Sequence, residues 1–165
     1  MQTGIIMEQT KVSFEEQLQY GKEGEKEIAL YLLNKGCSIL PLYQFNDELA
    51  PKIFTANEII TSPDLTVFKE EKCFFIEVKR KKQWVRFGEI VETGCNYRHY
   101  AEYKKVSRFT GIKLFLIFLH ENEEPCGKYL IDINTVGRYW NGKVNERKVS
   151  KPMYFWNINQ LNKLQ

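Results

Sequence analysis

Two carboxylates and a lysine lie at the ends of two neighbouring strands that the sequence predicts. Asp64 opens the strand expected over residues 64–68, and Glu77 and Lys79 end the strand expected over 73–79. Side chains alternate across a strand, so Glu77 and Lys79 share one face. A short polar turn joins the two strands and brings the start of the first beside the end of the second. We therefore expect these three side chains to converge.

Two carboxylates beside an ammonium group can hydrolyse a phosphodiester. Hard oxygen ligands hold Mg²⁺ (or Mn²⁺), which keeps several waters and contacts the phosphate. The ion lowers the pKa of a bound water, and a lysine can position that water or offset developing charge. Asp64 and Glu77, with the backbone carbonyl of Val78, are the expected metal ligands, and Lys79 is the expected catalytic ammonium.

The same pattern has a plainer explanation. In a chain with 27% charged residues, an aspartate followed by a Glu-x-Lys triplet arises often by chance, and Pro63 can simply open a strand with Asp64 in the turn. The apolar stretch over residues 73–76 favours the catalytic interpretation. Burying a glutamate and a lysine at the end of such a strand costs free energy unless a metal or a partner compensates their charges.

A fourth acidic residue, Glu25, falls on the apolar stripe of the predicted first helix. It shares that stripe with Ile28, Ala29 and Leu32, since positions three, four and seven apart are neighbours on a helix. A glutamate there points at the sheet, and a buried ionisable group usually has a functional reason. The alternative is that Glu25 marks the edge of the stripe and pairs with a neighbouring lysine, either 22 or 26.

Basic residues are concentrated in one part of the chain. Between Lys79 and Lys113 ten lysines and arginines face three glutamates, in a chain whose net charge is only +3. Such a stretch is typical of a partner with a phosphate backbone, here DNA, although a solvated surface would look the same. The expected DNA-binding residues follow the second predicted strand or lie on the second helix: Arg80, Lys81, Lys82, Arg86, Arg98, Lys104, Lys105 and Arg108.

The elements that position these residues follow from local patterns. Ser13 and Glu16 form a capping box, so a helix is expected over 14–34, although Gly21 and Gly24 inside it require a close backbone approach. Strands are expected over 37–43, 64–68, 73–79, 113–119, 128–133 and 153–156. A second helix is expected over 98–109, with Tyr100 and Tyr103 in the core, and a short final helix contains Ile158, Leu161 and Leu164. Residues 44–62 should be irregular, and Asn141-Gly142 should form a turn. The pattern predicts an α/β fold with a helix, three strands, a helix and a strand around a mixed central sheet. We expect a single domain over 1–165, with a core over about 13–120 and a small C-terminal extension over about 121–165.

Other classes of protein fit the composition poorly. No apolar run approaches the ~20 residues that cross a bilayer, and residues 1–10 do not resemble a secretory signal, so we expect a cytoplasmic protein with no membrane partner. A structural zinc site is excluded because the cysteines and histidines are isolated: Cys37, Cys73, Cys95, Cys126, His99 and His120.

The combination of motifs resembles the PD-(D/E)xK nuclease superfamily, whose fold is restriction-endonuclease-like. More narrowly, about the first 115 residues are similar to the archaeal-type Holliday junction resolvases. The similar stretches are Gly21 with Glu25, then Leu32-Leu33 with Gly36, then Pro63-Asp64-Leu65, and Phe75 to Lys79. The resemblance implies a Mg²⁺-dependent endonuclease acting on DNA, with Glu25, Asp64, Glu77 and Lys79 as its site residues, branched DNA as its leading substrate and a possible homodimer.

Two departures limit what the resemblance implies. The stretch from residue 44 to 62 is longer than the compact resolvases need, and about 45 residues follow the last shared strand. The resemblance therefore supports nuclease chemistry better than junction specificity, because this fold serves several substrates. The rival hypothesis is a nuclease-like module that binds DNA or a protein without cutting. The presence of all four site residues argues against it.

Overall fold

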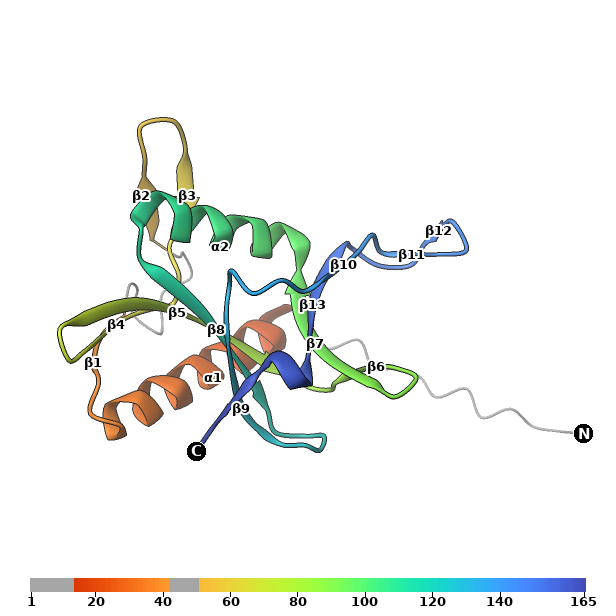
Figure 1. Ribbon diagram of the computed structural model, residues 1–165, viewed down its shortest axis with the longest axis horizontal. Coiled ribbons are helices and arrows are strands. Elements are labelled where there is room, and N and C mark those ends of the chain that lie inside the picture. Colours follow the sequence, from red (N-terminus) through yellow and green to blue (C-terminus); the bar gives the residue numbers. More distant parts are fainter. Residues whose placement is uncertain (1–13, 42–50) are drawn as a thin grey trace, which may run out of the picture.

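A six-stranded mixed sheet forms the centre of the computed structural model, which describes residues 14–41 and 51–165. Two helices lie on opposite sides of this sheet (Figure 1), as the separate apolar clusters around each helix also show. β5 and β8 run parallel, and the other neighbours run antiparallel, so the mixed α/β architecture is confirmed. The strands, in sheet order, are β1 (Ser38–Pro41), β4 (Leu65–Lys69), β5 (Lys72–Lys81), β8 (Lys113–His120), β9 (Gly127–Asp132) and β14 (Asn162–Leu164), and the helices are α1 (Phe14–Asn34) and α2 (Tyr97–Thr110).

The two faces of β5 belong to different parts of the core. Ile76 and Val78 pack with the α1 residues Ile28, Ala29 and Leu32. Alternate residues of the same strand face α2, where the buried side chains include Phe75, Tyr103, Val106, Leu116 and Phe118. Burying apolar surface against both helices stabilises the strand on each side. The alternation therefore assigns Glu77 and Lys79 to the α2 face, so the two residues share a face as the sequence predicts.

A second sheet of four strands stands beside the N-terminal end of α2. Its order is β10 (Arg138–Trp140), β13 (Met153–Asn157), β7 (Ile90–Asn96) and β6 (Val85–Phe87). The packing of β13 on β7 is tight at Gly94, where an added Cβ would lie 2.1 Å from the carbonyl oxygen of Tyr154. β5 continues to Lys81, two residues beyond its expected end, and β6 begins at Val85, so part of the basic stretch after the expected strand lies in strands.

Both helices match their predictions closely. α1 has the predicted bounds, and α2 begins after the N-cap Asn96 and ends at Gly111, whose φ of 68° allows the left-handed cap. The predicted strands are all present within a few residues of their expected ends. The capping residue Ser13, the region 1–10 that does not resemble a secretory signal, and residues 42–50 lie outside the described part of the chain.

Two predictions were wrong. The described part of the segment 44–62 forms a hairpin of β2 (Lys52–Phe54) and β3 (Ile59–Thr61) rather than irregular structure. The expected final helix is a single 3₁₀ turn over Ile158–Gln160, after which the chain joins the central sheet as β14. The two remaining strands, β11 (Lys143–Val144) and β12 (Arg147–Lys148), pair with each other. The tight turn that joins them lies at residues 145–146, and the bend at Gly142, where a turn was predicted, comes just before β11. Among the described residues, no helix is both long and apolar enough to cross a membrane.

Candidate active site

The three predicted strand residues meet on the hairpin of β4 and β5. Asp64 lies directly before β4, and its Oδ2 accepts a hydrogen bond of 2.7 Å from the backbone amide of Val78. Glu77 is one residue earlier on β5, where its Oε1 accepts a hydrogen bond of 2.5 Å from Lys79 Nζ. Leu65 pairs with Ile76 in the antiparallel ladder, so the next residue pair in this register is Asp64 and Glu77. The local register thus brings the two carboxylates side by side.

Electrostatics connect these residues to the fourth predicted site residue. Burial raises the pKa of Asp64 well above its usual value, and the negative charges of Glu77 and Glu25 raise it further. Lys79 and the amide of Val78 act in the opposite direction but do not restore the usual value. Glu25 is half-buried on α1, and its charge acts on Asp64. The structure brings all four predicted residues into one electrostatic cluster.

Lys79 remains protonated in this environment. Burial by itself would lower its pKa, but the negative charges of Glu77 and Asp64 and the hydrogen bond to Glu77 outweigh burial and raise the pKa well above its usual value. Its side chain is 24% exposed, against 7% for Glu77. A permanent ammonium that borders solvent can contact a phosphate oxygen or orient a water, which is the role expected of a catalytic lysine in phosphodiester hydrolysis.

Tyr103 also belongs to the candidate site, although the sequence analysis assigned this residue only to the core. It is buried as predicted, and its hydroxyl also donates a hydrogen bond of 2.6 Å to Glu77 Oε1. The Lys79 ammonium lies 5.4 Å from the centre of its ring. Tyr103 therefore holds Glu77 from the α2 side. The available signal was its place on the apolar face of a helix that follows the Glu-x-Lys strand, where a hydroxyl needs a polar partner.

Tyr103 should position Glu77, and Tyr103→Phe tests this role. The substitution keeps the ring and removes only the hydroxyl that fixes the carboxylate. For the nuclease that the sequence predicts, we expect DNA cleavage to fall about 10-fold and the Mg²⁺ concentration for half-maximal activity to rise, as for other groups that orient a metal ligand. Activity titrated against Mg²⁺ measures both effects. A purely structural role predicts a lower melting temperature with an unchanged Mg²⁺ requirement.

The donor set fits a magnesium ion that keeps part of its water shell. In the described ranges, 14–41 and 51–165, no three acidic, histidine or cysteine side chains form a group that could enclose a metal. Two adjacent carboxylates are nevertheless the usual protein share of a Mg²⁺ site, because Mg²⁺ retains waters and takes further oxygens from the phosphate. The repulsion between Asp64 and Glu77 supports this fit, since a divalent cation between them would remove it.

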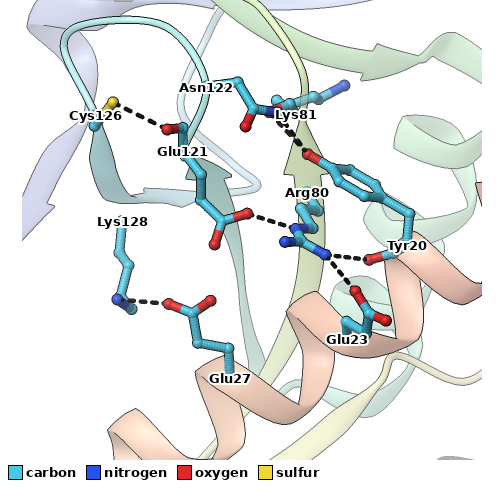
Figure 2. Close-up of polar contacts among 9 residues, drawn as sticks. All are labelled: Tyr20, Glu23, Glu27, Arg80, Lys81, Glu121, Asn122, Cys126 and Lys128. Carbon is cyan, nitrogen blue, oxygen red and sulfur yellow. Dashed lines mark hydrogen bonds and ion pairs between the residues drawn. The ribbon is translucent and has the colours of Figure 1, made fainter.

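Arg80 follows the site on β5 and links α1 to the β8–β9 connection, as Figure 2 shows. Its Nε donates to Glu121 Oε2 at 2.5 Å, and its Nη1 donates to Glu23 Oε2 at 2.9 Å and to the Tyr20 carbonyl at 3.2 Å. Gly24 makes this crossing possible, because an added Cβ would lie 3.1 Å from Arg80 Cβ. This confirms the expected close approach at Gly24, whereas at Gly21 nothing lies within 4 Å of the added atom.

A second ion pair holds α1 along the same line, from Lys128 Nζ on β9 to Glu27 Oε1 at 2.9 Å (Figure 2). Together with Arg80 it fixes the helix that carries Glu25 against the sheet. The guanidinium of Arg80 thus has a structural use within the protein. Its assignment as a DNA contact stays a prediction.

The other predicted DNA-binding residues differ in how they are held. Lys81, the last residue of β5, is half-buried, and burial together with the charge of Lys79 lowers its pKa to about 8. Lys82 is exposed, and Arg86 pairs with Glu123 at 3.1 Å. On α2, Lys105 pairs with Glu58 and Glu102, Lys104 bonds Asn134, and Arg98 and Arg108 are exposed. These two groups lie on different elements, and several of their members already have partners within the protein.

The histidines are separated in the structure as in the sequence. His120 is buried, stacks on Trp84 with ring centroids 3.7 Å apart, and its Nε2 lies 3.0 Å from Thr93 Oγ1. Burial lowers its pKa to about 4, so it is neutral near pH 7. His99 is exposed at the start of α2. Neither side chain belongs to a metal-binding group among the residues that the structure describes.

Comparisons with known proteins show the fold. No protein-family model matches the chain, and no curated protein sequence is similar to it. Among solved structures, the chain is similar to Hjc, a Holliday junction resolvase from the archaeal hyperthermophile Archaeoglobus fulgidus, with a TM-score of 0.53. The two sequences are 12% identical, and the match covers 83% of this chain and 88% of that chain. The central sheet and its helices therefore have a nuclease-like arrangement.

Proposed function

We propose that this protein is a Mg²⁺-dependent deoxyribonuclease of the PD-(D/E)xK type, with branched DNA as its preferred substrate. The observation that carries the proposal is the cluster of Asp64, Glu77 and Lys79 at one end of the β4–β5 hairpin, with Glu25 beside it. The structural likeness to Hjc supports the same proposal, because that protein is a Holliday junction resolvase. Branched DNA follows from this likeness alone and is the finer part of the proposal.

In the proposed mechanism each residue has a separate task. When bound, the metal ion would supply charge that polarises the phosphate and acidifies a water. Asp64 and Glu77 would hold that ion, and Lys79 would orient the attacking water and stabilise the charge that develops on the phosphate. Glu25 would add negative charge beside Asp64, which favours a cation there. Tyr103 would keep Glu77 in place.

A substrate panel tests the proposal. Purified protein is incubated with Mg²⁺ and a four-way junction, a linear duplex, a supercoiled plasmid or a single strand of DNA. We expect cleavage that EDTA abolishes and that is fastest on the junction. Lys79→Ala and Asp64→Asn should both be inactive, whereas Lys72→Ala should be active, because Lys72 is exposed at the opposite end of the same strand.

The outcomes separate the alternatives. Binding without cleavage in the wild-type protein supports a nuclease-like binding module instead. Cleavage that persists unchanged in both site variants indicates a contaminating nuclease and contradicts the assigned residues. Equal cleavage of all substrates retains the nuclease and removes the preference for branched DNA.

A further inference from the structure

A groove of about 660 Å³ runs along α2, and none of its lining residues belongs to the candidate active site. Its lining includes Tyr97, Ala101, Lys104 and Arg108, which follow one another at helical spacing, and Asn134 from the β9–β10 connection. Tyr103, which contacts Glu77, is on another face of the same helix. The groove is therefore a separate feature of α2, and the reaction proposed above does not use it.

Tyr97 and Tyr100 line one end of this groove, and the rings of Tyr139 and Tyr154 adjoin them. Tyr97 is 40% exposed and meets Tyr139 of β10 edge to face, with ring centroids 4.8 Å apart. Tyr139 is itself 53% exposed. Beneath them Tyr100 stacks on Tyr154 of β13 at 3.8 Å, which fixes the base of the cluster. An exposed ring on such a rigid support offers a flat face to another planar group.

Cationic groups occupy the rest of the groove. Lys104 Nζ is held by Asn134 Oδ1 at 2.6 Å, and the Arg108 guanidinium lies 4.8 Å from the centre of the Phe109 ring. Neither cation pairs with a carboxylate among the residues that the structure describes, whereas Lys105 pairs with both Glu58 and Glu102. The nearby carboxylate of Asp132 accepts the amide of Asn134. Two positive charges one helical turn apart thus remain for an anionic ligand.

We propose that this groove binds an unpaired segment of nucleic acid. Bases would stack on the Tyr97 and Tyr139 rings, and backbone phosphates would pair with Lys104 and Arg108. Rings and cations side by side select single strands, because the flat faces of bases inside a duplex are covered by their neighbours. The inference rests on the proposed function in one respect: it names the form of DNA that an enzyme acting on branched substrates would hold in this groove, outside its active site.

Binding of a fluorescent oligothymidine of about 15 nucleotides, followed by anisotropy in EDTA, tests the groove without cleavage. Tyr97→Ala should weaken binding about 10-fold, and Tyr97→Phe, which keeps the stacking ring, should bind like the wild type. The double variant Lys104→Ala/Arg108→Ala should also bind more weakly. Its plot of log affinity against log salt should be shallower by about 1.4, since two phosphate contacts are lost.

A matched control separates the groove from net charge. Lys69→Ala/Lys72→Ala removes the same charge at the β4–β5 turn, outside the lining of the groove, and should leave binding unchanged. The proposal is overturned if the protein does not bind oligothymidine, if Tyr97→Ala binds normally, if the control weakens binding equally, or if a duplex of the same length binds as tightly. Circular dichroism confirms that each variant is folded.

Cleavage assays on the same variants keep the two proposals apart. If the wild type cleaves DNA and the groove variants bind like the wild type, the nuclease proposal stands and the groove proposal falls. If the wild type cleaves no substrate but binds oligothymidine with the pattern above, the groove proposal stands and the protein is a binding module.

Discussion

Replacing Lys79 with methionine should abolish DNA cleavage and at the same time make the protein depend on Mg²⁺ for stability. Lys79 donates to Glu77 at 2.5 Å and also offsets the charge of Asp64. Loss of a charged group that stabilises a transition state lowers turnover by roughly 10²–10³-fold. The substitution also leaves a buried carboxylate without its ammonium, which should cost about 2 kcal/mol of stability, less than a fully buried pair because Lys79 is 24% exposed.

Thermal unfolding with and without Mg²⁺ measures the second effect. A loss of about 2 kcal/mol lowers the melting temperature of a domain of this size by roughly 4–8 °C. Mg²⁺ binds only the folded site, so it should raise the melting temperature of Lys79→Met more than that of the wild type, in which Lys79 competes for Glu77. Lys72→Met on the same strand is the control. A Lys79→Met protein that melts like the wild type in EDTA contradicts the ion pair.

Local patterns were sufficient to predict the parts of the site that lie on one hairpin. Asp64, Glu77 and Lys79 are joined by a two-strand unit whose register follows from a short turn, so alternation along β5 and proximity across the turn determine their arrangement. Glu25 was predicted because helical spacing places it on the stripe with Ile28 and Leu32, both of which are buried. Such inferences need only contacts between near neighbours in the sequence.

Tyr103 could not be assigned to the site in the same way. Its hydroxyl reaches Glu77 only because α2 packs across β5, a contact between residues 26 positions apart. The sequence shows a tyrosine on an apolar helix face, and this pattern is equally typical of a core residue. Only the packing of the helix on the sheet decides which carboxylate, if any, its hydroxyl meets.

β7 was missed because its buried residues are partly polar. Glu92 and Thr93 are both buried, so the strand lacks the alternation of apolar and polar residues by which strands are usually predicted. Their partners come from remote parts of the chain: Arg138 pairs with Glu92 at 2.5 Å, and His120 Nε2 contacts Thr93 at 3.0 Å. Long-range polar contacts compensate burial here, and no local pattern shows them.

The final segment illustrates an ambiguity of spacing. Ile158, Leu161 and Leu164 are three residues apart, which fits a helix but also fits a 3₁₀ turn followed by a strand. The structure adopts the second arrangement because β9 has an open edge, with which β14 pairs. Leu164 then packs beside the α1 cluster. Whether this segment forms a helix or a strand therefore depends on the free edge of β9, residues 127–132. The spacing of apolar residues within the segment gives no information about that edge.

Replacing Asp64 with asparagine should eliminate cleavage while making the protein more stable. Burial and the neighbouring charges of Glu77 and Glu25 disfavour a carboxylate at this position and raise its pKa. Asparagine removes that charge, can still accept the amide hydrogen of Val78, and can donate to Glu77. Without one of two carboxylate ligands, cleavage should fall on the order of 10³-fold. The gain in stability should be about 1 kcal/mol near pH 7, as expected when a strained functional group is replaced.

The pH dependence of this gain identifies its cause. A carboxyl group whose pKa is raised by folding contributes stability below its unfolded pKa, near 3.8, and this contribution is lost as the pH rises through the folded pKa. The difference in melting temperature between Asp64→Asn and the wild type should therefore be small near pH 4 and grow towards pH 7. Mg²⁺ should narrow it by stabilising only the wild type. Glu71→Gln, at an exposed position of the β4–β5 turn at the opposite end of the hairpin, is the control. A difference that is constant with pH would show that the gain has another origin and that Asp64 is not held as a costly charge.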